Sequence, residues 1–279
     1  MSQNVTKIKS RIKSVSGAYK VTSAMKLVST VKLKQWRNKM LANKDYSQEL
    51  SEVVELLLLS QKKNNSPFMT PNNGEKKLYI VISSTLGLCG SYNNNIFKVS
   101  DAEISKDDEA IILGGKGATH YANGEFKIIE GYNEFNSLID NELVNKISKF
   151  VIDEYQKGTY SEIHIIYSEY KNSLIFLAKD YKLLPFTYQV SESNEYPPIM
   201  EPSPKLLTEQ LIPFYIKTNI YSKFLESAVC EQGARSNAME NATNNAKDLL
   251  DELKIEFNKA RQGAITQEII EIVSASKAI

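Results

Sequence analysis

The chain has 279 residues, of which 42% are hydrophobic and 24% are charged. This composition argues against wholesale disorder, and the length allows one large domain or two small ones. No run of about 18 apolar residues occurs, so no membrane span is predicted. The only two cysteines, Cys89 and Cys230, cannot form a disulfide framework, which favours a reducing compartment. The 34 basic and 33 acidic residues nearly cancel, so the net charge of +1 excludes little.

The charges are unevenly distributed along the chain. The first 44 residues contain nine lysines, two arginines and no acidic residue, a side-chain charge of +11, so the remainder sums to −10. Such a segment could be an organelle presequence, a nucleic-acid-binding arm or a helix with a basic face. The excess of Lys over Arg argues against a presequence. No apolar segment with a small-residue cleavage site follows the start, so a secretory signal is not expected.

Both ends of the chain are predicted to be long helices. All eight prolines lie between positions 67 and 213, and proline costs about 3 kcal/mol inside a helix. We expect an N-terminal helix over residues 1–60 and a C-terminal helix over residues 205–279. Heptad spacing in the first and strict four-residue spacing of alanines in the second predict a coiled-coil seam through Ile8, Ile12, Val15, Ala234, Ala238, Ala242 and Ala246.

The two helices must pair antiparallel if they pair, because they leave opposite ends of one compact domain. At about 1.5 Å per residue, the C-terminal helix outreaches the other by roughly 20 Å. The projecting tip, residues 264–279, has few charges and several isoleucines. An unpaired helix of this kind requires an apolar socket in another protein.

The middle of the chain, residues 75–195, alternates strand-like and helix-like segments. Apolar runs at 78–82, 110–113 and 126–129 predict strands, and residues 141–156 have helical spacing. Lys171 and Asn172 separate two further strand-like runs, as in a hairpin. The fold class is therefore α/β, with a small Rossmann-like domain inserted between the two helices of a long antiparallel coiled coil.

No constellation of catalytic residues stands out. His120 and His164 are isolated from the cysteines and from each other, so no metal site is expected and His164 is interpreted as structural. The sequence Gly114–Gly117 lacks the spacing of a phosphate loop and is interpreted as a tight strand-to-helix turn. Cys89, in a second glycine loop, could be reactive or buried, and we expect it to be buried. The sequence predicts no cofactor, no metal and no catalytic residue.

Several motifs resemble those of the ATP synthase gamma subunit family. Residues 12–29 resemble its N-terminal signature, residues 235–246 and 257–269 resemble its most specific C-terminal motifs, and Gly87-Leu88-Cys89-Gly90 matches a loop of its central domain. The resemblance covers both helices strongly and the middle in outline. It implies the central rotor shaft of a proton-translocating ATP synthase, a non-catalytic subunit that couples proton flow to ATP synthesis and hydrolysis.

The resemblance also implies partners and contact residues. One copy would serve three alpha and three beta subunits, an epsilon subunit and a ring of c subunits, with no nucleic acid and no direct membrane span. The residues implied to contact the alpha–beta ring are Met25, Lys26, Arg261, Gln262, Thr266, Glu268 and Ile269. The absence of a targeting extension and the Lys-, Asn- and Ile-rich composition favour a peripheral location on the cytoplasmic face of a bacterial plasma membrane.

The sequence departs from the family pattern at two places, and it leaves two alternatives open. Thr85-Leu86 replaces a typical Asp-Arg pair, and Gly263 replaces an alanine, which costs about 0.5–1 kcal/mol of helix stability. The cysteine-bearing insertion of the chloroplast form has no counterpart. From the residues alone, the chain could instead be a basic coiled-coil protein that binds nucleic acid, with steep salt dependence. It could also be a nucleotide-binding α/β enzyme with helical extensions.

Overall fold

The computed structural model describes residues 2–59, 67–129, 141–185, 200–201 and 203–277. By its contacts the chain divides into two compact units, residues 1–30 with 235–279 and residues 31–234. We call the first the helix-pair unit and the second the sheet unit. The elements in chain order are α1 (Ser2–Leu59), β1 (Lys76–Ile82), α2 (Tyr92–Glu103), β2 (Glu109–Leu113), α3 (Gly115–His120), β3 (Lys127–Ile128), α4 (Asn141–Gln156), β4 (Tyr160–Tyr170), β5 (Phe176–Leu184) and α5 (Pro204–Lys277).

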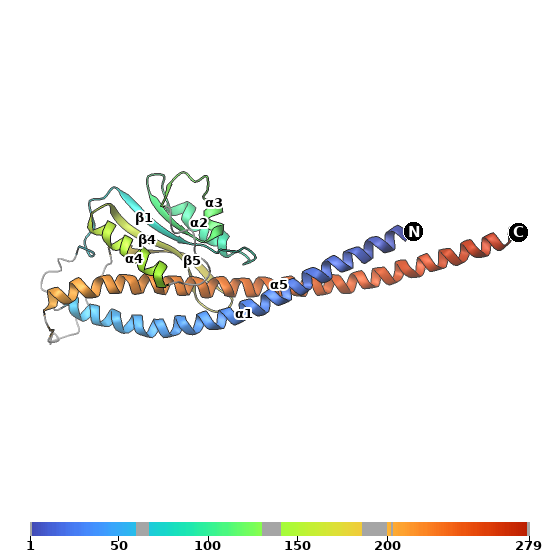
Figure 1. Cartoon of the computed structure of the whole chain (residues 1–279), viewed down its shortest axis with the longest axis horizontal. Coiled ribbons are helices and arrows are strands. Elements are labelled where there is room, and N and C mark those ends of the chain that lie inside the picture. The colour runs from blue at the N-terminus through green and yellow to red at the C-terminus, as the bar shows by residue number, and fades with distance from the viewer. Residues whose placement is uncertain (1, 60–66, 130–140, 186–199, 202, 278–279) are drawn as a thin grey trace. The chain divides into compact units, whose positions relative to one another are not determined.

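The sheet unit contains one five-stranded sheet in the order β3-β2-β1-β4-β5 (Figure 1). Strands β3, β2, β1 and β4 are parallel, and β5 runs antiparallel to β4. The predicted hairpin is confirmed, because β4 and β5 are joined directly by residues 171–175. The side-chain oxygen of Asn172 accepts hydrogen bonds from the N–H groups of Leu174 and Ile175, both at 2.9 Å, which fixes the turn.

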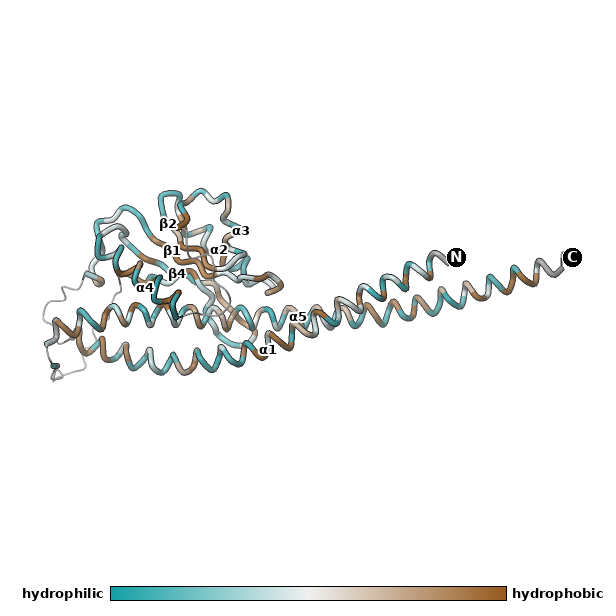
Figure 2. The backbone as a smooth tube through the Cα atoms, viewed as in Figure 1, coloured by the Kyte–Doolittle hydropathy of each residue, from teal (hydrophilic) through white to brown (hydrophobic). Residues whose placement is uncertain are grey.

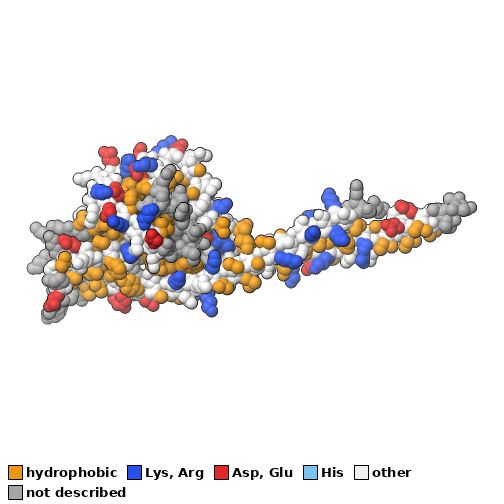
Figure 3. Space-filling model, viewed as in Figure 1, with side chains coloured by type: hydrophobic (Ala, Val, Ile, Leu, Met, Phe, Trp, Pro, Cys, Tyr) orange, Lys and Arg blue, Asp and Glu red, His pale blue; other side chains and the backbone are white. Residues whose placement is uncertain are grey.

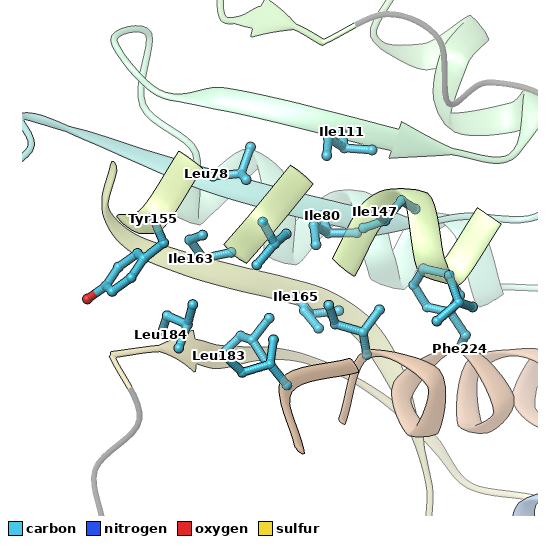
Figure 4. Packing of buried hydrophobic residues seen from close by; sticks show 14 of the residues in the cluster. Leu78, Ile80, Ile111, Ile147, Tyr155, Ile163, Ile165, Leu183, Leu184 and Phe224 are labelled. Atoms are coloured by element: carbon cyan, nitrogen blue, oxygen red, sulfur yellow. The ribbon is translucent and has the colours of Figure 1, made fainter. Parts of the chain in front are cut away.

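Alternate residues of the central strands face two different layers, as a parallel sheet covered on both sides requires. Leu78 and Ile80 of β1 belong to a core with Ile147 of α4 and Phe224 of α5 (Figure 4). The intervening residues of β1, among them Val81, belong to a second core with α2. Much of β1 and β2 is brown, the colour of hydrophobic residues, along the backbone trace in Figure 2. Full burial of each such side chain contributes about 1.5–3 kcal/mol.

The turn after β2 is the predicted tight connection from strand to helix. Gly114 has a φ of 93°, and a Cβ atom there would lie 2.4 Å from the carbonyl oxygen of Ser83. Lys116 donates its backbone N–H to the Ser84 carbonyl oxygen at 3.0 Å. Any residue other than glycine at position 114 would therefore clash with the end of β1. Cys89 is buried, as predicted, next to Ser84 and Asn93.

His164 is a structural residue of β4, as predicted, and it links two strands electrostatically. Its Nδ1 lies 2.7 Å from an oxygen of Asp180 on β5, and its Nε2 lies 3.1 Å from an oxygen of Glu162 on β4. Burial alone would lower the pKa of His164, but the hydrogen bonds and charges of Asp180 and Glu162 outweigh burial and raise it. Only the protonated ring can donate to both carboxylates at once.

This arrangement predicts a loss of stability at alkaline pH. Because the folded pKa of His164 is raised, its stabilisation is complete below the ordinary value of about 6.5 and disappears as the pH rises through the folded value. Thermal unfolding between pH 6 and 9 should show this loss in the wild type and not in His164→Gln. The exposed histidine provides a matched control, since His120→Gln should keep the wild-type profile. If the melting temperatures of the wild type and His164→Gln changed in parallel with pH, the stabilising role of protonated His164 would be contradicted.

Candidate interaction site on the helix pair

In the helix-pair unit, α1 presents one shielded stripe along its length. Buried or half-buried residues recur at alternating steps of three and four, beginning at Val5 and Ile8 and ending at Lys26 and Ser29. Alternating steps of three and four keep one stripe of a helix facing its partner, which is the geometry of a coiled coil. Shielded positions of α5 follow the same spacing from Ala246 to Ala264, with Leu253 the most buried of them.

Three side-chain contacts define how the two helices align. Thr22 lies 2.9 Å from Thr243, Lys26 forms an ion pair with Glu240 at 2.6 Å, and Thr30 lies 3.0 Å from Ser236, each distance joining side-chain polar atoms. The residue numbers rise on α1 as they fall on α5, so the helices are antiparallel. The predicted fold class, an antiparallel helix pair with an inserted α/β domain, is confirmed.

The predicted seam residues lie at partly or fully shielded positions. Ile8 is buried, and the other six are half-buried: Ile12, Val15, Ala234, Ala238, Ala242 and Ala246. Ala234 packs against the second core of the sheet unit, and the remaining six belong to the helix-pair unit. The alanines follow one another at single helical turns, so their small side chains leave room for a neighbouring helix along that stripe.

The C-terminal end of α5 projects beyond α1. The alignment set by the three contacts places Ser2 beside about residue 264, and α5 continues to Lys277, a further 20 Å at about 1.5 Å per residue. Large apolar side chains on this projection are 48–68% exposed, namely Ile265, Ile269, Ile270, Ile272 and Val273. Figure 3 shows hydrophobic side chains gathered along this end of the molecule. So much exposed apolar surface on one helix indicates an interaction site.

The residues implied to contact a partner fall into two separate groups. Arg261, Gln262, Thr266, Glu268 and Ile269 are all exposed on α5. Met25 is half-buried, and Lys26 is partly occupied by its ion pair with Glu240. In the alignment of the pair, Met25 and Arg261 are about 30 Å apart along the axis. The structure therefore presents two surfaces of one shaft and does not bring these residues into one pocket.

An exposed leucine near Met25 was not identified from the sequence as a surface residue. Leu27 is 66% exposed, and it lies between the exposed residues Val21 and Val28 along α1. The shielded stripe passes through Lys26 and leaves Leu27 on the outer surface. The sequence did contain a signal for this exposure, because Leu27 lies outside the heptad positions that predict the shielded face of α1.

A model of the ATP synthase family matches residues 4–279 of the chain. The gamma chain of Mycoplasmoides gallisepticum is 36% identical in an alignment of 281 positions, which covers 96% of this chain and 97% of that one. The sodium-ion-specific gamma chain of Acetobacterium woodii is 31% identical in an alignment of 301 positions, which covers the full length of both chains. The chain belongs to the ATP synthase gamma chain family. The resemblance found in its motifs is thus confirmed over nearly the whole sequence.

Solved structures of the same kind share the fold. The rotor of the Euglena gracilis mitochondrial ATP synthase gives a TM-score of 0.59 at 15% identity, covering 95% of this chain and all of that one. The central stalk of the Tetrahymena thermophila mitochondrial enzyme gives a TM-score of 0.56 at 22% identity, covering 80% of this chain and 99% of that one. Within the described residues of this gamma-family chain, no helix could span a membrane. No group of three or more His, Cys, Asp or Glu residues in the same part of the chain could hold a metal ion.

The alanine stripe predicts sensitivity to larger side chains. Ala238→Leu adds bulk at a half-buried position of the helix pair, and overpacking of this kind costs about 1–3 kcal/mol. The melting midpoint of the full chain should fall. Ala24→Leu makes the same change at an exposed position of α1 and should leave the midpoint nearly unchanged. Equal midpoints for the two variants would remove Ala238 from the seam.

Proposed function

We propose that the chain is the central rotor shaft of an ATP synthase, the role named for the rotor and central-stalk structures that share its fold. One copy stands inside a ring of three alpha and three beta subunits, with the helix-pair unit as the part that enters the ring. The sheet unit contacts the epsilon subunit and the ring of c subunits. The observation that carries the proposal is membership of the gamma chain family over nearly the full length.

The shaft acts by presenting different surfaces to identical partners. A protein contact shifts a conformational equilibrium only if it interacts differently with the two states. The two helices of the pair carry different side chains, so the shaft has no threefold symmetry of its own. In a threefold ring, each beta subunit then faces a different part of the shaft. The three catalytic sites become inequivalent, and rotation takes each site through every state.

The projecting tip of α5 supplies the apolar part of this contact. A helix end with exposed apolar side chains is stabilised when it enters a socket lined with apolar side chains. Exposed residues from Ile265 to Val273 provide that surface. A ring of subunits around such a tip would hold it laterally while still allowing it to turn, because apolar contacts have no directional requirement.

The basic surface of α1 and the side chain of Arg261 supply the polar part. The side chains of the first 44 residues carry a charge of +11. A guanidinium group can donate two parallel hydrogen bonds to a carboxylate, and Arg261 is exposed and able to do so. Acidic side chains of the beta subunits are the partners proposed for these groups.

Catalysis, ion coupling and location are assigned to the complex as a whole. The chain contributes no catalytic residue, and the nucleotide chemistry belongs to the alpha and beta subunits. It binds peripherally at the cytoplasmic face of a bacterial plasma membrane, through the membrane rotor. The transported ion is proposed to be the proton, although one relative is named as specific for sodium ions.

Loss of the Arg261 guanidinium should slow the assembled enzyme. In a complex reconstituted from this chain with alpha and beta subunits, Arg261→Ala should lower ATP hydrolysis several-fold, since a charged hydrogen bond contributes about 1.5–3 kcal/mol. Lys259→Ala removes another exposed positive charge two residues earlier and should have less effect. Circular dichroism would show that both variants remain helical. Wild-type turnover of Arg261→Ala would exclude the assigned role.

A charge placed on the apolar tip should impair assembly. Ile269→Asp puts a carboxylate on the side chain proposed to enter the socket, and burying it would be costly. Fewer complexes should form at a given subunit concentration, as measured by size-exclusion chromatography. Asn258→Asp, at an exposed position before the projection, is the matched control. Equal assembly of both variants would show that the tip is not buried in the complex.

A further inference from the structure

Strand β4 extends beyond the end of its neighbour β1. The two strands pair as far as Val81 and Ile166, whereas β4 continues to Tyr170. On its other side β4 remains paired with β5 up to Tyr170 and Phe176. Among the described residues, 167–170 therefore have a strand on one side only. The backbone groups on the other side need hydrogen-bonding partners, because unpaired buried amides are costly.

Side chains of α5 supply those partners. The N–H of Ser168 donates to Oγ of Ser227 at 3.1 Å, and the N–H of Tyr170 donates to Oε1 of Glu226 at 3.0 Å. Cys230 donates its S–H to the carbonyl oxygen of Ser168 at 3.2 Å. Ser168, Ser227 and Cys230 are all buried, so water does not compete for these bonds. We call these five residues the edge joint.

Neighbouring contacts strengthen the attachment on both sides. One turn before the joint, Nζ of Lys223 donates to the hydroxyl of Tyr167 at 3.1 Å and lies over the Tyr167 and Tyr181 rings at 4.6 and 4.7 Å. After the joint, a Cβ atom on Gly233 would lie 2.6 Å from the ring of Phe176, so a larger residue there would require the Phe176 ring to shift. Burial raises the pKa of Cys230 and keeps its thiol protonated as a donor.

The position of the joint in the sheet is unusual for this strand order. Open α/β sheets bind ligands beyond the carboxyl ends of the strands, where the strand order reverses. In this sheet the reversal lies between β1 and β4. The edge of β4 at that point is bonded to α5 itself. The place where related topologies hold a nucleotide is thus used to attach a helix.

We propose that the edge joint transmits torque between the sheet and the shaft helix α5, an inference that rests on the proposed rotor function. Apolar packing resists separation of a helix from a sheet, but it has no directional preference and so resists rolling or sliding weakly. Hydrogen bonds weaken steeply when their angles change. Three such bonds from one turn of α5 to the fixed backbone of β4 oppose both motions of the helix.

The first experiment tests the joint in the full chain. Hydrogen–deuterium exchange is measured by mass spectrometry on a peptide that contains Ser168 and Tyr170. In Glu226→Ala/Ser227→Ala these amides should exchange at least tenfold faster than in the wild type. Glu226→Gln keeps an acceptor oxygen and should retain slow exchange, as should Ser222→Ala, a matched change on the same helix. Slow exchange in the double variant would overturn the joint.

The second experiment tests torque in the assembled enzyme. During ATP synthesis driven by an ion gradient, torque must pass through the sheet unit to α5. During ATP hydrolysis by the detached head of alpha, beta and gamma subunits, no torque has to pass through the sheet unit. In the double variant the rate of ATP synthesis should fall several-fold, and the rate of ATP hydrolysis by the detached head should stay within twofold of the wild type. The Glu226→Gln variant should synthesise ATP at the wild-type rate. Wild-type synthesis together with fast amide exchange would overturn the torque role. Failure of the wild-type chain to assemble with alpha and beta would overturn the proposed function itself, and the exchange result would still stand.

Discussion

The structure depends on α5 serving two kinds of packing with one uninterrupted helix of 74 residues. From Ile212 to Phe224 its buried side chains belong to the core of the sheet unit, and further along it Leu253 is shielded in the helix pair. A helix used in this way needs large apolar residues for the sheet and small ones where another helix approaches closely. The isoleucines at 212, 216 and 220 and the alanines at 238, 242 and 246 meet these two requirements in turn.

The long-range features of the fold could be predicted because they depend on repeated local signals. Helix length follows from the absence of proline over many residues, and the seam follows from a spacing sustained for several turns. The projecting tip required only the two helix lengths and the rise per residue. Pro213 is a local exception within α5. It lies past the first turn and removes one helical hydrogen bond, while Ile212 and Ile216 on either side pack in the core of the sheet unit.

The polar contacts could not be predicted, because each joins residues that the sequence places far apart. Lys26 and Glu240 are separated by 214 positions, and Tyr170 and Glu226 by 56. No periodicity relates the members of such a pair. His164 illustrates the limit: its strand suggested a structural role, but its two carboxylate partners depend on the register of β5 against β4. To know which residues of α1 stay exposed, one must know which side of α1 is shielded by α5, as Leu27 shows.

The middle of the helix pair combines directional bonds with a buried apolar side chain, Met239. The hydroxyl of Thr30 donates to the carbonyl oxygen of Lys26, so its contact with Ser236 must use the Ser236 proton. Thr22 and Thr243 lie 2.9 Å apart, and each hydroxyl also has a backbone carbonyl oxygen in reach, that of Tyr19 and that of Met239 respectively. The proton argument therefore fixes the orientation of the Thr30–Ser236 contact alone. Hydrogen bonds of this kind contribute about 0.5–1.5 kcal/mol each, less than a buried leucine. Most of the free energy that pairs the helices in this unit must then come from apolar side chains, of which Ile8, Met239 and Leu253 are the most deeply buried.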